Sequence, residues 1–115
     1  MLLTANVENL SDNTAVVTFS GPLTLGTSLK MVDSQVQQAI QKGVTRMVFD
    51  FSAVDFVDSA GLGMIVCAYG AISEKNGAFR LCGVQPRIQS LFHLTKTDNF
   101  LPIDTGRDES LAAMN

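Results

Sequence analysis

The sequence has few of the residues that build metal sites and few of the charges that hold nucleic acids. It contains one histidine and two cysteines, Cys67 and Cys82, which lack the spacing of metal ligands. A zinc site of cysteine and histidine therefore cannot be assembled. The eight lysines and arginines are scattered and the net charge is −3, which excludes a basic nucleic-acid surface and a polybasic membrane anchor. We expect no metal, no cofactor and no nucleic-acid partner.

Long apolar runs and targeting segments are absent as well. The longest apolar run, residues 61–72, is shorter than the roughly 20 residues that a membrane-spanning helix needs. The first residues lack the basic segment that opens a signal peptide. We therefore expect a cytoplasmic protein that does not insert into membranes, and we expect both cysteines to be reduced thiols in its core.

The low charge and high apolar content instead indicate one folded domain. Apolar residues make up 46% of the 115 residues and charged residues 17%, which excludes a disordered or acidic tail. A chain of this length buries roughly 65% of its unfolded surface on folding, enough for a core without disulfide or metal staples. We expect a single domain over residues 1–115.

Hydrophobic periodicity predicts alternating strands and helices after an amino-terminal pair of strands joined at residues 11–13. The predicted strands are residues 7–10, 14–20, 46–51, 78–82 and 101–103, and the predicted helices are residues 27–42, 59–75, 86–93 and 108–114. This order predicts an α/β fold with a mixed, mostly parallel sheet of four or five strands and four helices. In such sheets function gathers at the carboxyl ends of the strands, which makes the loops at residues 20–27, 52–60 and 82–86 the candidates.

Local signals set the expected ends of these elements. Thr27 and Asp108 are the expected N-caps of the first and last helices, and Pro86 is expected in the first turn of the third. In the strand at residues 46–51 apolar residues fall on both faces, as in a parallel sheet with both faces covered.

The segment from Asp58 to Gly63, which reads Asp-Ser-Ala-Gly-Leu-Gly, links a predicted strand to a predicted helix. Ser59 stands at the positive end of the helix, where a phosphate on its hydroxyl would find backbone N–H donors. Gly61 and Gly63 would each cost about 0.8–1 kcal/mol in a helix relative to alanine, which suggests that something approaches the helix closely there. The alternative is that Ser59 or Asp58 serves only as an N-cap and that the glycines allow close packing.

The helix that follows this segment is apolar nearly all round. Its predicted face against the sheet contains Leu62, Ile65, Val66, Tyr69 and Ile72. A second stripe, of mostly small residues, contains Ala60, Gly63, Met64, Cys67 and Ala71. A helix with apolar residues on every side is either buried or covered by a partner. We expect the second stripe to be a docking surface with Met64 at the interface, and the same stripe can serve a homodimer.

These features resemble the STAS domain of bacterial anti-sigma factor antagonists. The resemblance rests on residues 58–63 placed after a strand that ends Phe-Asp-Phe-Ser at residues 49–52, and it extends over about residues 16–113. It includes the exit of the second strand at residues 21–25 and the strand and helix at residues 77–94. The resemblance implies a phosphorylation-controlled binding module and not an enzyme.

In that family a serine at the position of Ser59 is phosphorylated by a serine kinase that is also an anti-sigma factor. The resemblance implies that the unmodified chain binds this kinase and frees a sigma factor. It also implies that phosphorylation ends the binding and that a PP2C-type serine phosphatase restores it. Pro22 and Thr24 stand in a loop where the family often has acidic residues. The implied partner-binding residues are Thr24, Asp58, Ser59, Ala60, Gly61, Gly63, Met64 and Cys67.

Other interpretations use the same fold or the same residues differently. Some members of this family keep the fold without phosphorylation, as scaffolds or transporter-associated subunits. Asp50, Asp55 and Asp58 would be the Mg²⁺ ligands of an enzyme, but neither a lysine or histidine base nor a Walker-type phosphate loop accompanies them. A response-regulator receiver domain, which has a similar length, needs an acidic pair and a lysine at strand ends where this chain has neither.

Overall fold

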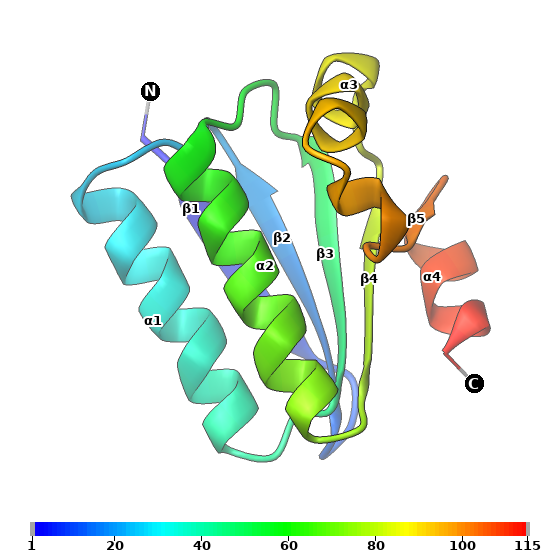
Figure 1. Cartoon of the computed structure of the whole chain (residues 1–115). Coiled ribbons are helices and arrows are strands. Elements are labelled where there is room, and N and C mark those ends of the chain that lie inside the picture. Colours follow the sequence, from blue (N-terminus) through cyan, green and yellow to red (C-terminus); the bar gives the residue numbers. More distant parts are fainter. Residues whose placement is uncertain (1, 115) are drawn as a thin grey trace.

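The computed structural model describes residues 2–114, which form a five-stranded sheet with helices on both faces (Figure 1). The strands are β1 (Thr4–Asn9), β2 (Thr14–Ser20), β3 (Arg46–Ala53), β4 (Ala78–Cys82) and β5 (Ile103–Asp104). The helices are α1 (Thr27–Gln41), α2 (Ser59–Glu74), α3 (Pro86–Leu94) and α4 (Arg107–Ala113), with a short 3-10 helix, η1 (Thr97–Asn99), after α3. The predicted α/β class, with a mostly parallel sheet and four helices, is confirmed for this part of the chain. None of these helices is long and apolar enough to cross a bilayer.

The strands follow one another across the sheet in the order β1-β2-β3-β4-β5. β1 is antiparallel to β2, with Val7 opposite Val17, and the other neighbours are parallel, with Val17 opposite Phe49. β1 begins earlier than predicted, at Thr4, because Ala5 and Val7 both pack against the core. Parallel pairing brings the carboxyl ends of β2, β3 and β4 to one edge of the sheet. Figure 1 shows the loops that lead into α1 and α2 at this edge.

Alternating side chains divide the core between the two faces of the sheet. The larger part lies under α1 and α2, where the ring of Phe19 meets those of Phe49 and Phe51 edge-on at centroid distances of 4.8 and 5.3 Å. The opposite face carries a smaller patch of Val16, Val48, Cys82 and Met114. Both faces of β3 are therefore covered, as the sequence predicted.

A polar network holds α4 on this second face. Arg80 of β4 donates two hydrogen bonds to Asp104 of β5, at 2.6 and 3.1 Å, and Ser110 of α4 donates to the same carboxylate at 2.7 Å. The bonds from Arg80 chiefly hold the pKa of Asp104 below its ordinary value. Arg107 of α4 donates to the Thr18 hydroxyl at 3.0 Å, so the helix is tied to β2 as well as to β5.

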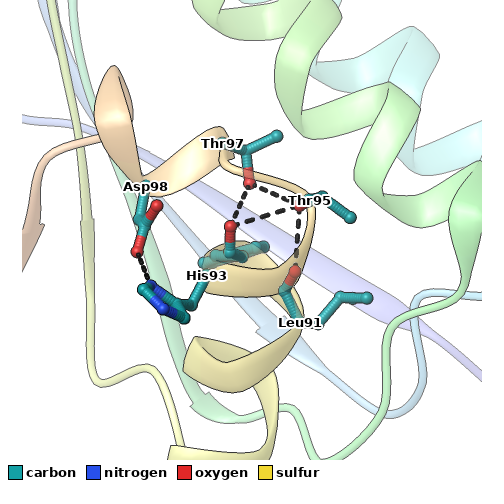
Figure 2. Close-up of polar contacts among 6 residues, drawn as sticks. Leu91, His93, Thr95, Thr97 and Asp98 are labelled. Carbon is teal, nitrogen blue, oxygen red and sulfur yellow. Dashed lines mark hydrogen bonds and ion pairs between the residues drawn. The ribbon is translucent and has the colours of Figure 1, made fainter.

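Threonine hydroxyls close the turn from α3 into η1 (Figure 2). Thr95 Oγ1 donates to the carbonyl oxygen of Leu91 at 2.9 Å and lies 3.0 Å from the hydroxyl of the buried Thr97. The Thr97 hydroxyl donates to the carbonyl oxygen of Phe92 at 3.3 Å, so these side chains bond carbonyl groups of the last turn of α3. On the surface of the same turn, His93 pairs with Asp98 at 3.1 Å. The single histidine therefore takes part in a hydrogen bond that spans the α3–η1 turn.

Two of the predicted helix ends are wrong. The N-cap residues of α1 and α4 are Gly26 and Gly106, so Thr27 is the first residue of α1 and Asp108 lies in the first turn of α4. Neither helix has a side-chain hydrogen bond at its cap. Gly26 has a φ of 157°, a backbone conformation that side chains disfavour, and the helix begins only after this turn. Pro86 lies at the start of α3, as predicted.

The two cysteines lie in different environments and both are free thiols. Cys82 is buried, and burial raises its pKa to about 11. Cys67 is exposed on α2. The prediction that both thiols lie in the core is therefore wrong for Cys67, because the second side of α2 faces away from the sheet.

Candidate functional site

Two of the three predicted loops run side by side at the carboxyl end of the sheet. The loop between β2 and α1 meets the loop between β3 and α2 through a parallel bridge of Leu23 and Val57. The Leu23 N–H donates to the Phe56 carbonyl oxygen at 2.9 Å, and the Asp58 N–H donates to the Leu23 carbonyl oxygen at 3.1 Å. Residues 20–27 therefore lie against the beginning of α2.

The third predicted loop, after β4, contacts β3 instead. Gly83 has a φ of 67°, and a Cβ atom at this position would lie 3.1 Å from the backbone nitrogen of Ser52. Glycine is thus required here both by backbone conformation and by close approach. This loop packs on the end of β3, and the two other loops form the surroundings of Ser59.

Asp58 joins the two loops with a single carboxylate. One oxygen, Oδ1, accepts a hydrogen bond from the Gly61 N–H at 2.9 Å and so caps α2. The other, Oδ2, accepts from the Leu25 N–H, also at 2.9 Å. The bond from Leu25, followed by that from Gly61, holds the pKa of Asp58 below its ordinary value. The ionised form of this side chain is therefore the one that fits the site.

Ser59 is the first residue of α2 and is exposed. Because Asp58 supplies the cap, the Ser59 hydroxyl is not needed to satisfy the helix end. Within residues 2–114 this hydroxyl makes no hydrogen bond. The sequence offered Asp58 and Ser59 as candidate N-caps of α2. In the structure Asp58 is the N-cap, and Ser59 is exposed.

The two glycines of the motif have different surroundings. A Cβ atom on Gly61 would overlap the carbonyl oxygen of Leu23 and lie 2.8 Å from its Cβ atom, whereas a Cβ atom on Gly63 would meet nothing within 4 Å. The group that approaches Gly61 is therefore the chain's own loop. Gly63 faces open space, and no packing within the described part of the chain explains why it is not alanine.

α2 is rotated about its axis relative to the prediction. Its buried residues are Gly61, Met64, Ile65, Ala68 and Ile72. Met64 is only 6% exposed and packs in the main core, so its predicted place at an interface is wrong. Leu62, Val66 and Tyr69, predicted to face the sheet, are only half-buried. Of the predicted docking stripe, Gly63 and Cys67 are exposed and Ala60 is half-buried.

Several exposed residues without charge lie on α2 near Ser59 and on the two loops that are joined at its start. We define the α2 entry surface as Leu25, Phe56, Ser59, Gly63 and Cys67, all of which are exposed. Thr24, also in the predicted set, is half-buried beside it. α2 carries no charged residue before Glu74, and Leu25 and Phe56 expose 75% and 47% of their surface. A neutral, partly apolar surface of this kind is typical of a protein contact.

Sequence reasoning missed Leu25 and Phe56. Both are apolar residues in loops, outside any helical or strand periodicity. The available signal was their position, because a large apolar residue in a loop has no regular element to bury it. The structure brings their two loops together through the Asp58 carboxylate.

The three aspartates of the magnesium alternative do not converge. Asp50 accepts hydrogen bonds from the Ser52 N–H and hydroxyl, at 3.0 and 2.6 Å, while Asp58 caps α2 and Asp55 is exposed in the loop. Among the described residues no three His, Cys, Asp or Glu side chains are grouped as a metal site would require.

Comparison with known proteins gives consistent matches. A model of the STAS domain family matches residues 6–110. The anti-sigma F factor antagonist of Paenibacillus polymyxa is 34% identical over 89 residues, which cover 76% of this chain and 75% of that protein.

Solved structures agree with this match. The crystal structure of an anti-sigma factor antagonist from Mycobacterium paratuberculosis has a TM-score of 0.85 at 27% identity, covering 97% of this chain and 93% of that one. The Bacillus cell fate determinant SpoIIAA in its phosphorylated form has a TM-score of 0.77 at 19% identity, covering 97% and 100%. The second likeness is one of fold alone.

The two glycines lead to a matched prediction. Gly63→Ala should raise the free energy of unfolding by about 0.5–1 kcal/mol, because alanine favours the helix and meets no neighbour. Gly61→Ala should lower it by about 1–3 kcal/mol, because the new methyl group overlaps the Leu23 backbone. Urea unfolding of both variants measures the difference. A stabilised Gly61→Ala variant would contradict the contact between the loop and α2.

The pKa of Asp58 leads to a prediction about pH. Because the folded state lowers this pKa, the stability from the ionised form is fully present above the unfolded value of about 4 and is lost as the pH falls through the lower folded value. Asp58→Asn has only one acceptor oxygen for two N–H groups, so it should melt below the wild type at neutral pH. This gap in melting temperature should narrow below about pH 4.

Asp55→Asn, which changes an exposed carboxylate in the same loop, is the control, and its gap should be small at every pH. Thermal melts between neutral pH and about pH 2 measure both variants. A gap for Asp58→Asn that stays constant with pH would show that the charge of Asp58 does not hold the two loops.

Proposed function

The chain belongs to the STAS domain family and is related to the anti-sigma factor antagonists, and we propose that it is itself an anti-sigma factor antagonist switched by phosphorylation of Ser59. In this proposal the unmodified chain binds an anti-sigma factor that is also a serine kinase, and so releases a sigma factor. The observation that carries the proposal is the position of Ser59, which is exposed at the start of α2 and whose hydroxyl makes no hydrogen bond within residues 2–114, since Asp58 caps the helix.

The α2 entry surface supports the docking step. Gly63 lies one turn from Ser59 and leaves open space where a side chain would stand, so a partner can approach the helix backbone. Leu25 and Phe56 supply exposed apolar area on the two loops that Asp58 joins at the start of α2, and burial of such area is the main favourable term in most protein association. A kinase that docks here would have the Ser59 hydroxyl at its contact edge.

The electrostatics around Ser59 support the step in which phosphorylation releases the partner. A phosphate on Ser59 adds about −1.5 to −2 charges at neutral pH. It would stand next to Asp58, whose pKa is lowered and which is therefore ionised. The Gly61 N–H, one of the donors at the helix end, is already bonded to Asp58. The phosphate charge would remain on a neutral docking surface, where repulsion and desolvation oppose the complex.

Reversal completes the proposed cycle. The phosphorylated serine is on the surface, at the beginning of a helix, where a PP2C-type serine phosphatase can reach it. Removal of the phosphate restores the neutral surface and hence the docking. The chain supplies the switched surface in this cycle, and its partners supply the catalysis.

Calorimetric titration against the host's anti-sigma factor kinase tests the proposal. Gly63→Glu should weaken binding at least about tenfold, because it places a desolvated charge at the contact. Gly70→Glu is the matched control, since Gly70 lies on the same helix, also with nothing near its Cβ position, but two turns further from Ser59. Ser59→Asp should weaken binding, and Ser59→Ala should bind as the wild type does.

Equal binding by all four variants would reject the α2 entry surface as the interface. The chain would then be better described as a scaffold of the same fold that is not switched by phosphorylation. Melting temperatures of each variant, measured alongside, separate loss of binding from loss of folding.

A further inference from the structure

We propose that a second copy of this chain pairs with the first through strand β1, so that two sheets join into one. β1 is an edge strand of the sheet, it is six residues long, and it contains neither proline nor lysine. Edge strands that remain monomeric are usually shortened, bulged, covered or charged, because a free edge is a template for pairing. The only charged residue of β1 is Glu8.

The register with β2 shows which backbone groups of β1 face outward. The Leu10 N–H donates to the Thr14 carbonyl oxygen at 2.9 Å, in continuation of the ladder between the two strands. Bonded and non-bonded pairs alternate along an antiparallel ladder. The N–H and C=O groups of Ala5, Val7 and Asn9 therefore point away from β2, toward the open edge.

The surroundings of this edge are open and partly apolar. A groove of about 370 Å³ runs between β1 and α1, and its lining includes Ala5, Val7 and Asn9. Toward the amino end of the strand, Leu2 and Met31 line a neighbouring groove and expose 77% and 65% of their surface. α1 therefore leaves this side of the strand open, and small side chains of an added strand would fit beside it.

The strand is complementary to itself in one register. Pairing centred on Val7 sets Val7 against Val7 of the second copy and Ala5 against Asn9 in both directions. This register uses the outward N–H and C=O groups of all three residues in each copy. It also sets Glu8 against Asn6 of the second copy, so no like charges meet.

Neighbouring registers are poorer. A shift that sets Val7 against Asn9 brings Glu8 opposite Glu8, and like charges directly opposite each other destabilise a sheet. A shift that sets Val7 against Ala5 leaves Asn9 without a partner. The register centred on Val7 is therefore the one that β1 favours for a two-fold dimer.

Sedimentation measurements over a range of concentrations test the dimer. We expect the mass of two chains at high concentration. Val7→Pro removes the outward N–H of Val7 and leaves the hydrogen bonds to β2 in place. Because the dimer is two-fold symmetric, the equivalent bond of the second copy is lost as well. The dissociation constant of the dimer should therefore rise roughly tenfold or more. Val7→Thr, which keeps the N–H, is the control and should dimerise like the wild type. A dimer unaffected by Val7→Pro would overturn the proposal and place the interface elsewhere, as on α2.

Disulfide trapping tests the register without depending on the proline variant. In a Cys67→Ser background, chains with Asn6→Cys and chains with Glu8→Cys should cross-link rapidly when mixed, because these positions face each other across the axis. Each variant alone should cross-link much more slowly. Cross-linking that is equally fast in the mixture and in the single variants, or absent in the mixture, would overturn the proposal. So would a mass of one chain at every concentration up to millimolar.

Discussion

The geometry of the candidate site depends on the carboxylate of Asp58. Each of its oxygens accepts one backbone N–H, from Gly61 at the start of α2 and from Leu25 in the preceding loop. A neutral amide has one acceptor oxygen in place of these two, and its NH₂ group would face the other N–H. The helix end and the loop are thus held together by a charge that the site itself stabilises, and among the described residues the neighbouring Ser59 hydroxyl has no hydrogen-bond partner.

The two glycines of the motif follow from this arrangement. Gly61 has no side chain because the Leu23 backbone, drawn in by the Asp58 N–H, lies where a side chain would be. Gly63, one turn from Ser59, has open space around it. One glycine serves the fold and the other lowers helix stability without an internal reason, which is expected where a residue serves an external contact.

Much of the fold was predictable from the sequence because local patterns are strong. β-branched and aromatic residues marked β2 and β3, apolar residues at helical spacing marked α1, and the alternation of the elements indicated a parallel sheet. The site's position in the chain was predictable as well, because Ser59 and its glycines stand at a strand-to-helix junction, where parallel strands place their functional loops.

The orientation of the site's side chains was not predictable, for physical reasons. α2 has apolar residues on nearly every side, so periodicity alone did not set its rotation. Met64 was therefore assigned to the docking stripe, whereas the structure buries it. Cys67 was assigned both to that stripe and to the core, and the structure exposes it. Asp and Ser cap helices about equally well, so only the second hydrogen bond, from Leu25, distinguishes Asp58. That bond joins residues 33 positions apart and has no local signature.

A phosphate on Ser59 should abolish docking at the start of α2. The most direct measurement is calorimetric titration of the anti-sigma factor kinase with two preparations of the wild-type chain, one unmodified and one carrying a single phosphate mapped to Ser59. We expect tight binding by the first and a loss of at least about a hundredfold for the second, since charge repulsion and desolvation act together. Equal affinity of the two preparations, or a phosphate that maps to any other hydroxyl group, would contradict it.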